Sequence, residues 1–395
     1  MRKALIATCG LFAALLAAAP ASAQQPIKIG LIMPYSGQFA DTAAQMDNAI
    51  KLYVKLNGDT VAGRKIEFVR KDTGGIAPDV AKRLAQELVV RDNVDILAGF
   101  VLTPNAMAAG DVSAEAKKFM VVMNAATAII TNKSPYMTRT GSTVPQNTET
   151  LGTWAASKGG IKKAYTMVSD YGPGHDAEQG FIRAFKEAGG EIVGSVRMPV
   201  ANPDFSAFVQ RAKDLNPEAI FIFVPGGAQP AAIGKALGER GIDTSRTKVM
   251  GMGELTEDEA RKSMGDAALG IITVYHYDHG HDSAKNKAFV AAYKEAYGGR
   301  NPNIYSMGGY DGIHLIYEAL KKTGGKADGD ALIAAAKGMK WESPRGPVSI
   351  DPETRDIIQT IYIRRVEKAG GDTRNVEFDK VENVKDPVKA RAKTN

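Results

Sequence analysis

Two short apolar runs in the segment 95–131 each end abruptly in small or polar residues. The runs lie at 96–98 and 119–123, and a helix-like segment follows each polar stretch. An apolar run, a polar loop and a helical pattern in this order are typical of the strand–loop–helix unit of a parallel sheet. In such a sheet the loops lie side by side at the carboxyl ends of the strands, where hydroxyls and helix-start N–H groups face one crevice. The segment is therefore predicted to form one wall of a small-molecule binding cleft.

The same alternation of strand-like and helix-like patterns runs along most of the chain. Before the cleft segment, strand patterns at 27–33 and 65–70 alternate with helical patterns at 41–56 and 79–91. A polar, strand-like crossing at 136–142 closes this first series. Strands that alternate with helices are typical of parallel sheets joined by right-handed crossovers. The first third of the chain is therefore predicted to be an α/β unit.

A second series of the same kind follows the crossing. It has strand patterns at 163–168, 191–197, 219–224, 248–252 and 270–275, and helical patterns at 146–157, 180–188, 205–215 and 228–240. Helical patterns return at 283–297, 308–322 and 330–337, followed by a turn-rich crossing at 343–348 and a long strand at 357–366. A chain of 395 residues is too long for one compact core, so two α/β domains are predicted.

The first residues have the parts of a secretory signal peptide. Arg2 and Lys3 are followed by an apolar run at 4–19 and an Ala-x-Ala site at 21–23. We predict that residues 1–23 are removed by cleavage after Ala23 and that the mature protein is exported to the periplasm.

Cysteine usage and charge exclude several classes of protein. The only cysteine, Cys9, lies inside the predicted signal peptide, so the mature chain has no disulfide and no thiol chemistry. After residue 23 no apolar run approaches the ~18 residues of a membrane span. The net charge is +6, and the basic residues near the C-terminal end are interleaved with acids and lack neighbouring aromatics. They predict a solvated tail rather than a nucleic-acid surface.

Several short motifs, taken in their order and spacing, resemble one family of binding proteins. They are IKIG at 27–30, PYSG at 34–37, NAAT at 124–127, DYGPG at 170–174, the glycine pair at 226–227 and YD at 310–311. Over nearly its whole mature length the chain resembles the periplasmic leucine/isoleucine/valine-binding family of ABC-transporter solute receptors. The resemblance implies an α/β, two-lobed type I periplasmic-binding-protein fold. Each lobe would be a parallel sheet flanked by helices, and a three-crossing hinge would join the lobes.

The resemblance also implies how the chain is divided and what it does. Residues 24–142 with 276–347 would form lobe 1, and residues 143–275 with 348–395 would form lobe 2. The implied function is that of the extracytoplasmic solute-binding component of an ABC transporter, which closes around a small hydrophobic carboxylate and delivers it to a membrane permease. A monomer with no cofactor, no nucleic-acid partner and no catalytic residue is expected.

The family pattern, carried over residue by residue, implies a ligand site shared by both lobes. Hydroxyls and N–H groups in the loop after Gly99 and at 125–127 would hold a carboxylate, in agreement with the donors expected near helix starts. Tyr171 would cover the ligand from lobe 2 beside the loop at 226–229, and Tyr305 would line the side-chain pocket. The predicted ligand-binding residues are Phe100, Leu102, Thr103, Asn105, Ala125, Ala126, Thr127, Tyr171, Gly227, Ala228, Glu254 and Tyr305.

Departures from the family pattern bear on which ligand is bound. Amino-acid binders of this family have a serine-rich loop where this chain has LTPN at 102–105, and an aromatic residue at about Ala228. Their ammonium-holding glutamate falls at Gly253 or, with a shift of one residue, at Glu254. A buried ammonium without a carboxylate partner is costly, so an amine-free aromatic acid is predicted as a ligand beside a branched-chain or other hydrophobic amino acid. Flat apolar walls for an aromatic ring would come from Phe100, Tyr171, Tyr275 and Tyr305.

Simpler interpretations stay open for several of these residues. Thr103 and Asn105 could cap a helix, Tyr171 could belong to a plain turn, and Phe100 and Tyr305 could be core residues.

One cluster could bind a metal ion. The sequence HYDHGHD contains His276, His279 and His281, but this spacing matches no hydrolase signature, and no metal site is predicted.

Two other functional classes differ from a transport receptor. An exported hydrolase is less favoured because the chain has no HExxH, no GxSxG, no P-loop and no strong GxGxxG after the first strand. A sensory ligand-binding protein would use the same cleft and differ only in the surface that docks to its membrane partner.

Overall fold

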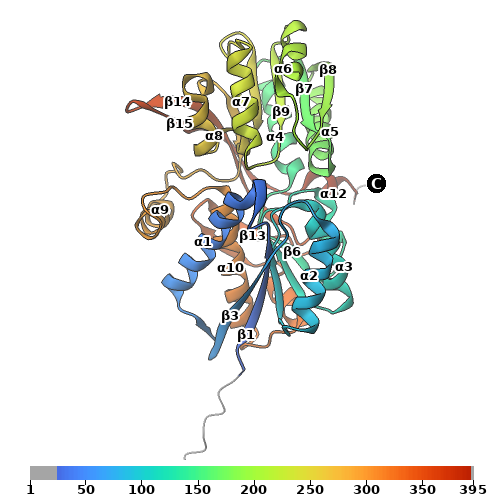
Figure 1. Cartoon of the computed structure of the whole chain (residues 1–395), viewed down its shortest axis with the longest axis vertical. Helices are drawn as coiled ribbons and strands as arrows, with labels where there is room; N and C mark the ends of the chain where they lie inside the picture. The colour runs from blue at the N-terminus through green and yellow to red at the C-terminus, as the bar shows by residue number, and fades with distance from the viewer. Residues whose placement is uncertain (1–24, 393–395) are drawn as a thin grey trace, which may run out of the picture.

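The structure is a computed structural model that describes residues 25–392, so the predicted signal peptide at 1–23 lies outside the described residues. These residues form two sheets of mostly parallel strands, each flanked by helices, that lie one above the other along the long axis of the molecule (Figure 1). Every helix within residues 25–392 is too short or too polar to cross a bilayer. The predicted α/β fold with two lobes is confirmed.

The first sheet has six strands in the order β2-β3-β1-β4-β5-β6. The strands are β1 (Ile27–Met33), β2 (Thr60–Val61), β3 (Arg64–Asp72), β4 (Ile96–Gly99), β5 (Phe119–Val122) and β6 (Met137–Arg139). The accompanying helices are η1 (Gly37–Phe39), α1 (Ala40–Asn57), α2 (Pro78–Val90), α3 (Thr103–Glu115), η2 (Ala128–Asn132), α9 (Ala284–Ala296), α10 (Ile304–Lys322) and α11 (Gly329–Ala336). Strands β1, β4 and β5 are apolar and almost wholly buried, as expected where helices cover both faces of a parallel sheet.

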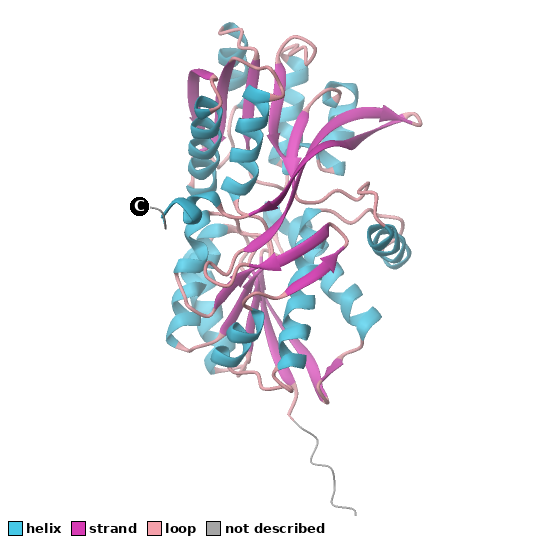
Figure 2. Ribbon diagram, turned by 180° about the vertical axis from the view of Figure 1, so that it is seen from behind, coloured by secondary structure: helices cyan, strands magenta, loops and turns pink. Residues whose placement is uncertain are grey.

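The second sheet has nine strands, with β12-β13-β14-β11-β10-β9-β7-β8 in order and β15 paired with β14. The strands are β7 (Lys163–Ser169), β8 (Glu191–Met198), β9 (Ala219–Phe223), β10 (Lys248–Met252), β11 (Ile272–Tyr275), β12 (Lys340–Ser343), β13 (Gly346–Ile350), β14 (Ile357–Ala369) and β15 (Asp372–Val384). The accompanying helices are α4 (Val144–Ser157), α5 (Gly172–Glu187), α6 (Phe205–Asp214), α7 (Gln229–Glu239), η3 (Gly253–Thr256), α8 (Asp258–Met264), η4 (Gly265–Ala268) and α12 (Pro387–Ala392). Figure 2 shows β14 and β15 as a long hairpin that extends from this sheet.

Parallel pairing brings the carboxyl ends of several strands to one edge of each sheet. In the first sheet β1 pairs with β4 and β4 pairs with β5, so the loops that follow these strands emerge side by side. In the second sheet β9 lies between β7 and β10 in the same parallel manner. Both sets of loops contribute to one cavity in the middle of the molecule.

Buried ion pairs tie together the segments through which the chain passes between the sheets. Arg139 at the end of β6 pairs with Asp356, just before β14, at 2.6 Å, and Lys389 of α12 reaches the other carboxylate oxygen of Asp356 at 2.7 Å. A second buried pair joins Arg345 to Asp311 of α10 at 2.7 Å. Each charge that leaves water here meets an opposite charge, which fixes the arrangement of the crossings.

The C-terminal region differs from the sequence prediction. The basic residues from Lys380 onward do not form an unstructured tail, because the segment 380–392 is part of β15, paired antiparallel with β14, and of α12. The side chains of Lys380 and Lys385 are exposed, as predicted. The turn-rich crossing at 343–348 belongs to a hairpin of the short strands β12 and β13. Strand β15 was not recognised in the sequence because charged residues are interleaved along it. It is an edge strand, and charged side chains on such a strand remain exposed to water. Lys389 is buried because it finds Asp356, a partner distant in sequence.

Candidate functional site

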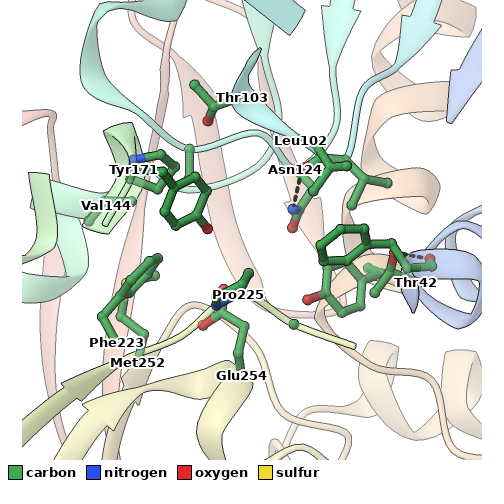
Figure 3. A pocket seen from close by; sticks show the side chains of 16 residues that line it. Thr42, Leu102, Thr103, Asn124, Val144, Tyr171, Phe223, Pro225, Met252 and Glu254 are labelled. Atoms are coloured by element: carbon green, nitrogen blue, oxygen red, sulfur yellow. Dashed lines mark hydrogen bonds between the residues drawn. The ribbon is translucent and has the colours of Figure 1, made fainter. Parts of the chain in front are cut away.

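A cavity lies between the two sheets, where the loops at the strand ends meet (Figure 3). Its empty space, including the part that is open to solvent, is about 470 Å³. The segments of the first sheet contribute Phe39, Thr42, Val101, Leu102, Thr103, Asn124, Ala126 and Tyr305, and those of the second contribute Val144, Tyr171, Pro173, Phe223, Pro225, Gly226, Met252 and Glu254. Among the described residues that line the cavity, none is a lysine, arginine or histidine, and Glu254 is the one carboxylate.

Thr103 and Thr127 place two hydroxyl groups at one end of the cavity. Thr103 is the first residue of α3, and its hydroxyl is directed toward the cavity (Figure 3). The main-chain N–H of Thr127 donates to the Oγ1 of Thr103 at 3.4 Å, and the hydroxyl of Thr127 donates to the same atom at 3.2 Å. Because this oxygen already accepts two hydrogen bonds, its own proton is left for a ligand atom.

Main-chain N–H groups add to the donors at this end. Those of Thr103 and Asn105 lie in the first turn of α3, where the helix itself provides no acceptor. Within residues 25–392 the N–H of Ala126 also has no hydrogen-bond acceptor. Hydroxyls and N–H groups at a helix start attract anions. This end of the cavity is therefore suited to a carboxylate.

Arg139 supports the donor loop from behind. Its buried guanidinium donates to the carbonyl oxygens of Ala125 at 3.2 Å, Thr127 at 2.8 Å and Ala128 at 3.4 Å. These bonds hold the loop that carries the Ala126 N–H, and they draw its carbonyl oxygens away from the cavity. Asp356 neutralises the guanidinium, so Arg139 positions the loop without contacting the cavity.

The side walls of the cavity are flat and apolar. Tyr171 precedes the first turn of α5, and its ring lies 6.3 Å from that of Phe223 with a tilt of 33°. Figure 3 shows this pair and Met252 on one side of the cavity and Leu102 on the other. Burial raises the pKa of the Tyr171 hydroxyl, so it stays a neutral phenol. Walls of this kind favour a flat apolar ligand body.

Glu254 faces the cavity from the second sheet, on the side opposite Thr103 (Figure 3). It follows β10 in the first turn of η3. The hydroxyl of Tyr275 donates to its Oε1 at 3.0 Å, whereas its Oε2 is out of solvent and has no hydrogen-bond partner among the described residues. Burial raises the pKa of this carboxyl to about 7. Near neutral pH, Glu254 is therefore divided between its protonated and ionised forms.

The sequence matches a known family over most of its length. The model of the family described as periplasmic binding protein matches residues 26–372. The chain belongs to the periplasmic binding protein family.

Relatives of this periplasmic binding protein include one curated protein and two solved structures. The curated relative is Leu/Ile/Val-binding protein homolog 6 of Brucella melitensis biotype 1, which is 43% identical over 374 residues and matches over 94% of this chain and 95% of its own length. A solute binding protein of an ABC transporter from Rhodopseudomonas palustris BisB5, solved with 3,4-dihydroxybenzoic acid, is 56% identical with a TM-score of 0.89 over 92% of this chain and 99% of its own. Another solute binding protein, from Rhodopseudomonas palustris HaA2, was solved with p-hydroxybenzoic acid. It is 43% identical with a TM-score of 0.89, and the match covers 93% of this chain and 100% of its own. The resemblance inferred from the sequence is confirmed, and the fold is the two-lobed type I fold.

The structure brings about half of the predicted ligand-binding residues together at the cavity. Those that line it are Leu102, Thr103, Ala126, Tyr171, Glu254 and Tyr305. Thr127 is bonded to Thr103 beside the cavity. Gly227 and Ala228 line an adjoining space, which also touches Glu254 and Tyr305.

The remaining predicted residues of this periplasmic binding protein lie behind the cavity wall. Phe100 and Ala125 are buried in the core of the first sheet. Asn105 points to the loop before α2, where its Oδ1 accepts from the N–H of Ala77 at 2.9 Å and its Nδ2 donates to the carbonyl of Gly75 at 2.8 Å. These contacts stabilise the fold around the site.

Several lining residues were missed by reasoning from the sequence. Phe223 and Met252 are the last residues of β9 and β10, so the rule that ligands bind at the carboxyl ends of parallel strands could have pointed to them. Arg139, which supports the donor loop without lining the cavity, was also missed, and its sequence signal is weaker, an arginine inside a strand-like run. Phe39 carries no local signal, because its place depends on how the two sheets face each other, whereas Gly226 belongs to the loop at 226–229 that the sequence had pointed to.

The three histidines of the HYDHGHD cluster separate in the structure. His276 is buried, His279 contacts Asp258 at 3.1 Å, and His281 contacts Glu377 at 2.8 Å. Within residues 25–392 no group of three or more histidine, cysteine or carboxylate side chains is placed to hold a metal ion.

Proposed function

We propose that this protein is the extracytoplasmic solute receptor of an ABC transporter and that it binds a small aromatic carboxylate in the cavity between its lobes. One observation carries the proposal. Hydroxyl and N–H donors gather at one end of a flat apolar cavity, without any lysine or arginine among the described lining residues. Such an end holds a carboxylate by hydrogen bonds, and such walls hold a ring.

The ligands of the related structures support the same class. Both relatives from Rhodopseudomonas palustris were solved with hydroxylated benzoic acids, and they are 56% and 43% identical to this chain over more than nine tenths of it. A benzoate-type acid has no amine, so it needs no buried counterion for an ammonium group.

A hydrophobic amino acid is the second candidate, because Glu254 lies in the cavity. Its unpartnered Oε2 could accept from an ammonium group. The curated relative is named a Leu/Ile/Val-binding protein homolog, which agrees with this alternative. Burial raises the pKa of Glu254 to about 7 when no ammonium lies beside it, and an ammonium in the cavity would favour the ionised carboxylate.

We further propose that the lobes are residues 24–142 with 276–347 and residues 143–275 with 348–395, joined by a hinge of three crossings. The grouping of β1 to β6 in one sheet and of β7 to β11 and β14 in the other supports this division, whereas β12 and the start of β13, which it assigns to lobe 1, join the second sheet through β14. Contacts between the lobes support closure around a ligand, since the carboxylate of Asp176 in α5 accepts from the N–H of Ala128 at 2.9 Å.

The remaining parts of the proposal concern export, partners and chemistry. As a periplasmic binding protein the chain would be exported, with cleavage after Ala23, and would deliver its ligand as a monomer to a membrane permease. A binding role without catalytic activity is part of the proposal, and the family assignment and the solute-binding relatives support it.

A thermal-shift screen tests the proposal. Purified mature protein is melted with benzoate-type acids, cinnamate-type acids, branched-chain amino acids and aromatic amino acids, each at millimolar concentration. We expect amine-free aromatic acids to raise the melting temperature, because a ligand that binds only the folded state stabilises it. A screen in which only amino acids raise it would overturn the aromatic-acid proposal in favour of the second candidate.

A further inference from the structure

The cavity has polar groups at two opposite ends. The hydroxyl of Thr103 and the N–H of Ala126 provide donors at the end formed by the first sheet, where Thr127 donates to the Oγ1 of Thr103. Glu254 stands at the other end, and the apolar residues Leu102 and Phe223 lie between the two ends (Figure 3). A ligand that satisfies the whole cavity therefore has a carboxylate at one end of a flat body and a second polar group at the other.

The direction of the ligand follows from charge. A carboxylate of the ligand beside Glu254 would meet a like charge whenever Glu254 is ionised. Arg364, the basic residue behind Glu254, is already bonded to Asp278 at 3.1 Å and donates to the carbonyl of Gly253 at 3.4 Å. The carboxylate therefore belongs at the Thr103 end, and the far side of the ring faces Glu254.

The free oxygen of Glu254 selects the second polar group. Because Oε1 accepts from Tyr275, the carboxyl is held in one orientation, and Oε2 is the atom without a partner. A buried polar atom left without a hydrogen bond is costly, and a C–H of the ring cannot satisfy it. A hydroxyl both donates and accepts, so it satisfies Oε2 whether Glu254 is ionised or protonated.

We propose that Glu254, oriented by Tyr275, hydrogen-bonds a hydroxyl on the ring of the bound acid on the side away from the carboxylate. The preferred ligands are thus aromatic acids hydroxylated at the 4- or 3-position, and Glu254 is the residue that distinguishes them from benzoate. This inference rests on the proposed function and names the substrate class within it.

The other groups around Glu254 fit this role. The hydroxyls of Tyr171 and Tyr305 belong to side chains that line the same cavity, and burial keeps both phenols neutral. Glu257 lies three residues further on and lines the adjoining space rather than the cavity. It therefore offers a matched control, a neighbouring glutamate that the ligand does not touch.

Titration calorimetry with four acids tests the inference. Dissociation constants of the wild-type protein at pH 7 are measured for benzoate and for its 2-, 3- and 4-hydroxy derivatives. The 2-hydroxy isomer has its hydroxyl next to the carboxylate, at the wrong end for Glu254. We expect 4- or 3-hydroxybenzoate to bind about 10- to 100-fold more tightly than benzoate, and the 2-hydroxy isomer to show no such gain.

Variants then assign the preference to one residue. In Glu254→Leu the ratio of the benzoate constant to the 4-hydroxybenzoate constant should fall to within about threefold of one, whereas Glu254→Gln, which keeps hydrogen-bonding atoms, should retain part of it. Glu257→Gln should keep the wild-type ratio. Thermal melting of each variant identifies any that does not fold. If Glu254→Leu does not fold, the ratio of dissociation constants measured for Glu254→Gln decides the test.

Failure of the inference and failure of the proposed function give different results. If wild type binds benzoate and 4-hydroxybenzoate equally, or if Glu254→Leu weakens both by the same factor, Glu254 does not recognise a ring hydroxyl although the protein still binds aromatic acids. If none of the four acids binds while leucine does, the proposed function itself is wrong.

Discussion

The hydroxyl of Tyr305 lies so close to Gly226 that a Cβ at residue 226 would stand 1.7 Å from it. Tyr305 belongs to α10, beside the first sheet, and Gly226 follows β9 of the second sheet, so this contact spans the cavity. The next position behaves similarly, because a Cβ at Gly227 would stand 2.5 Å from the carbonyl oxygen of Gln38. The two glycines allow the lobes to approach, and a side chain on either would hold them apart.

Gly226→Ala should weaken ligand binding without unfolding the protein. The ring of Tyr305 is buried, with 5% of its surface exposed, so it has little room to move aside. We expect a loss of affinity for aromatic acids of at least about tenfold, ~1.4 kcal/mol, measured by titration calorimetry. Gly238→Ala in α7, where the new Cβ would meet Ala267 at an ordinary 3.4 Å, is the matched control.

A second substitution tests the cause. In the double variant Gly226→Ala/Tyr305→Phe the clashing oxygen is gone, and the nearest remaining atom of residue 305 lies 2.9 Å from the new Cβ. Adding Gly226→Ala to Tyr305→Phe should therefore cost less affinity than adding Gly226→Ala to the wild-type protein. Strictly additive losses would show that the contact between the lobes does not control binding.

Thr103→Val should remove a donor from the carboxylate end while keeping the shape of the side chain. The hydroxyl of Thr103 accepts from Thr127 and has its proton free for the ligand, so its loss affects both the ligand and the Thr127 hydroxyl. We expect an affinity for benzoate lower by about tenfold or more, since hydrogen bonds to charged groups contribute about 1.5–3 kcal/mol. Thr153→Val, at an exposed position of α4, should change nothing. Unchanged binding by Thr103→Val would place the carboxylate elsewhere.

Asp356→Asn should destabilise the protein strongly. The side chain of Asp356 is 1% exposed and pairs with both Arg139 and Lys389, so its neutralisation leaves two buried cations without a counterion. We expect the free energy of unfolding to fall by about 3–5 kcal/mol, measured by urea denaturation. The exposed pair of Lys158 and Asp379 provides the comparison, because Asp379→Asn should cost less than about 1 kcal/mol. Equal, small effects would mean that the crossings are held by other contacts.

The raised pKa of Glu254 predicts a pH-dependent difference between wild type and Glu254→Gln. In the folded protein this pKa is about 7, against a usual value of 4.5. Below pH 4.5 the carboxyl is therefore protonated in both the folded and the unfolded protein, and it does not lower the free energy of unfolding. Between pH 4.5 and pH 7 the unfolded chain releases this proton while the folded protein keeps it, so the free-energy penalty grows over this interval to at most about 3 kcal/mol and is constant above it. The unfolding free energy of wild type should therefore fall relative to that of Glu254→Gln between pH 4.5 and pH 7. A difference that stays constant over this interval would show that Glu254 titrates normally.

Local patterns predicted the elements and one wall of the site, whereas long-range contacts could not be predicted. The apolar runs at 96–98 and 119–123 are long enough to identify β4 and β5, and the loop after β4 carries Leu102 and Thr103 into the cavity. The structural role of Asn105 depends on the loop before α2, which packs beside it only in the folded protein. Short polar loops near strand ends thus look alike in sequence whether they face a ligand or a neighbouring loop.

Residues that act through distant partners were missed for the same reason. Arg139 supports the donor loop because Asp356, more than two hundred residues later, neutralises it. Strand β15 forms because β14 offers it an edge, although its own sequence is rich in charge. From the sequence, the family's glutamate position could be matched to either Gly253 or Glu254. The structure decides between them, because the side chain of Glu254 lines the cavity.

The central claim is that the cavity binds an aromatic carboxylate rather than an amino acid. Titration calorimetry of the wild-type mature protein with 4-hydroxybenzoate and, separately, with L-leucine tests it directly. The account predicts one ligand per chain with a dissociation constant of about 1 μM or lower for 4-hydroxybenzoate, and no measurable heat of binding for leucine. Tight binding of leucine together with no binding of 4-hydroxybenzoate would contradict it.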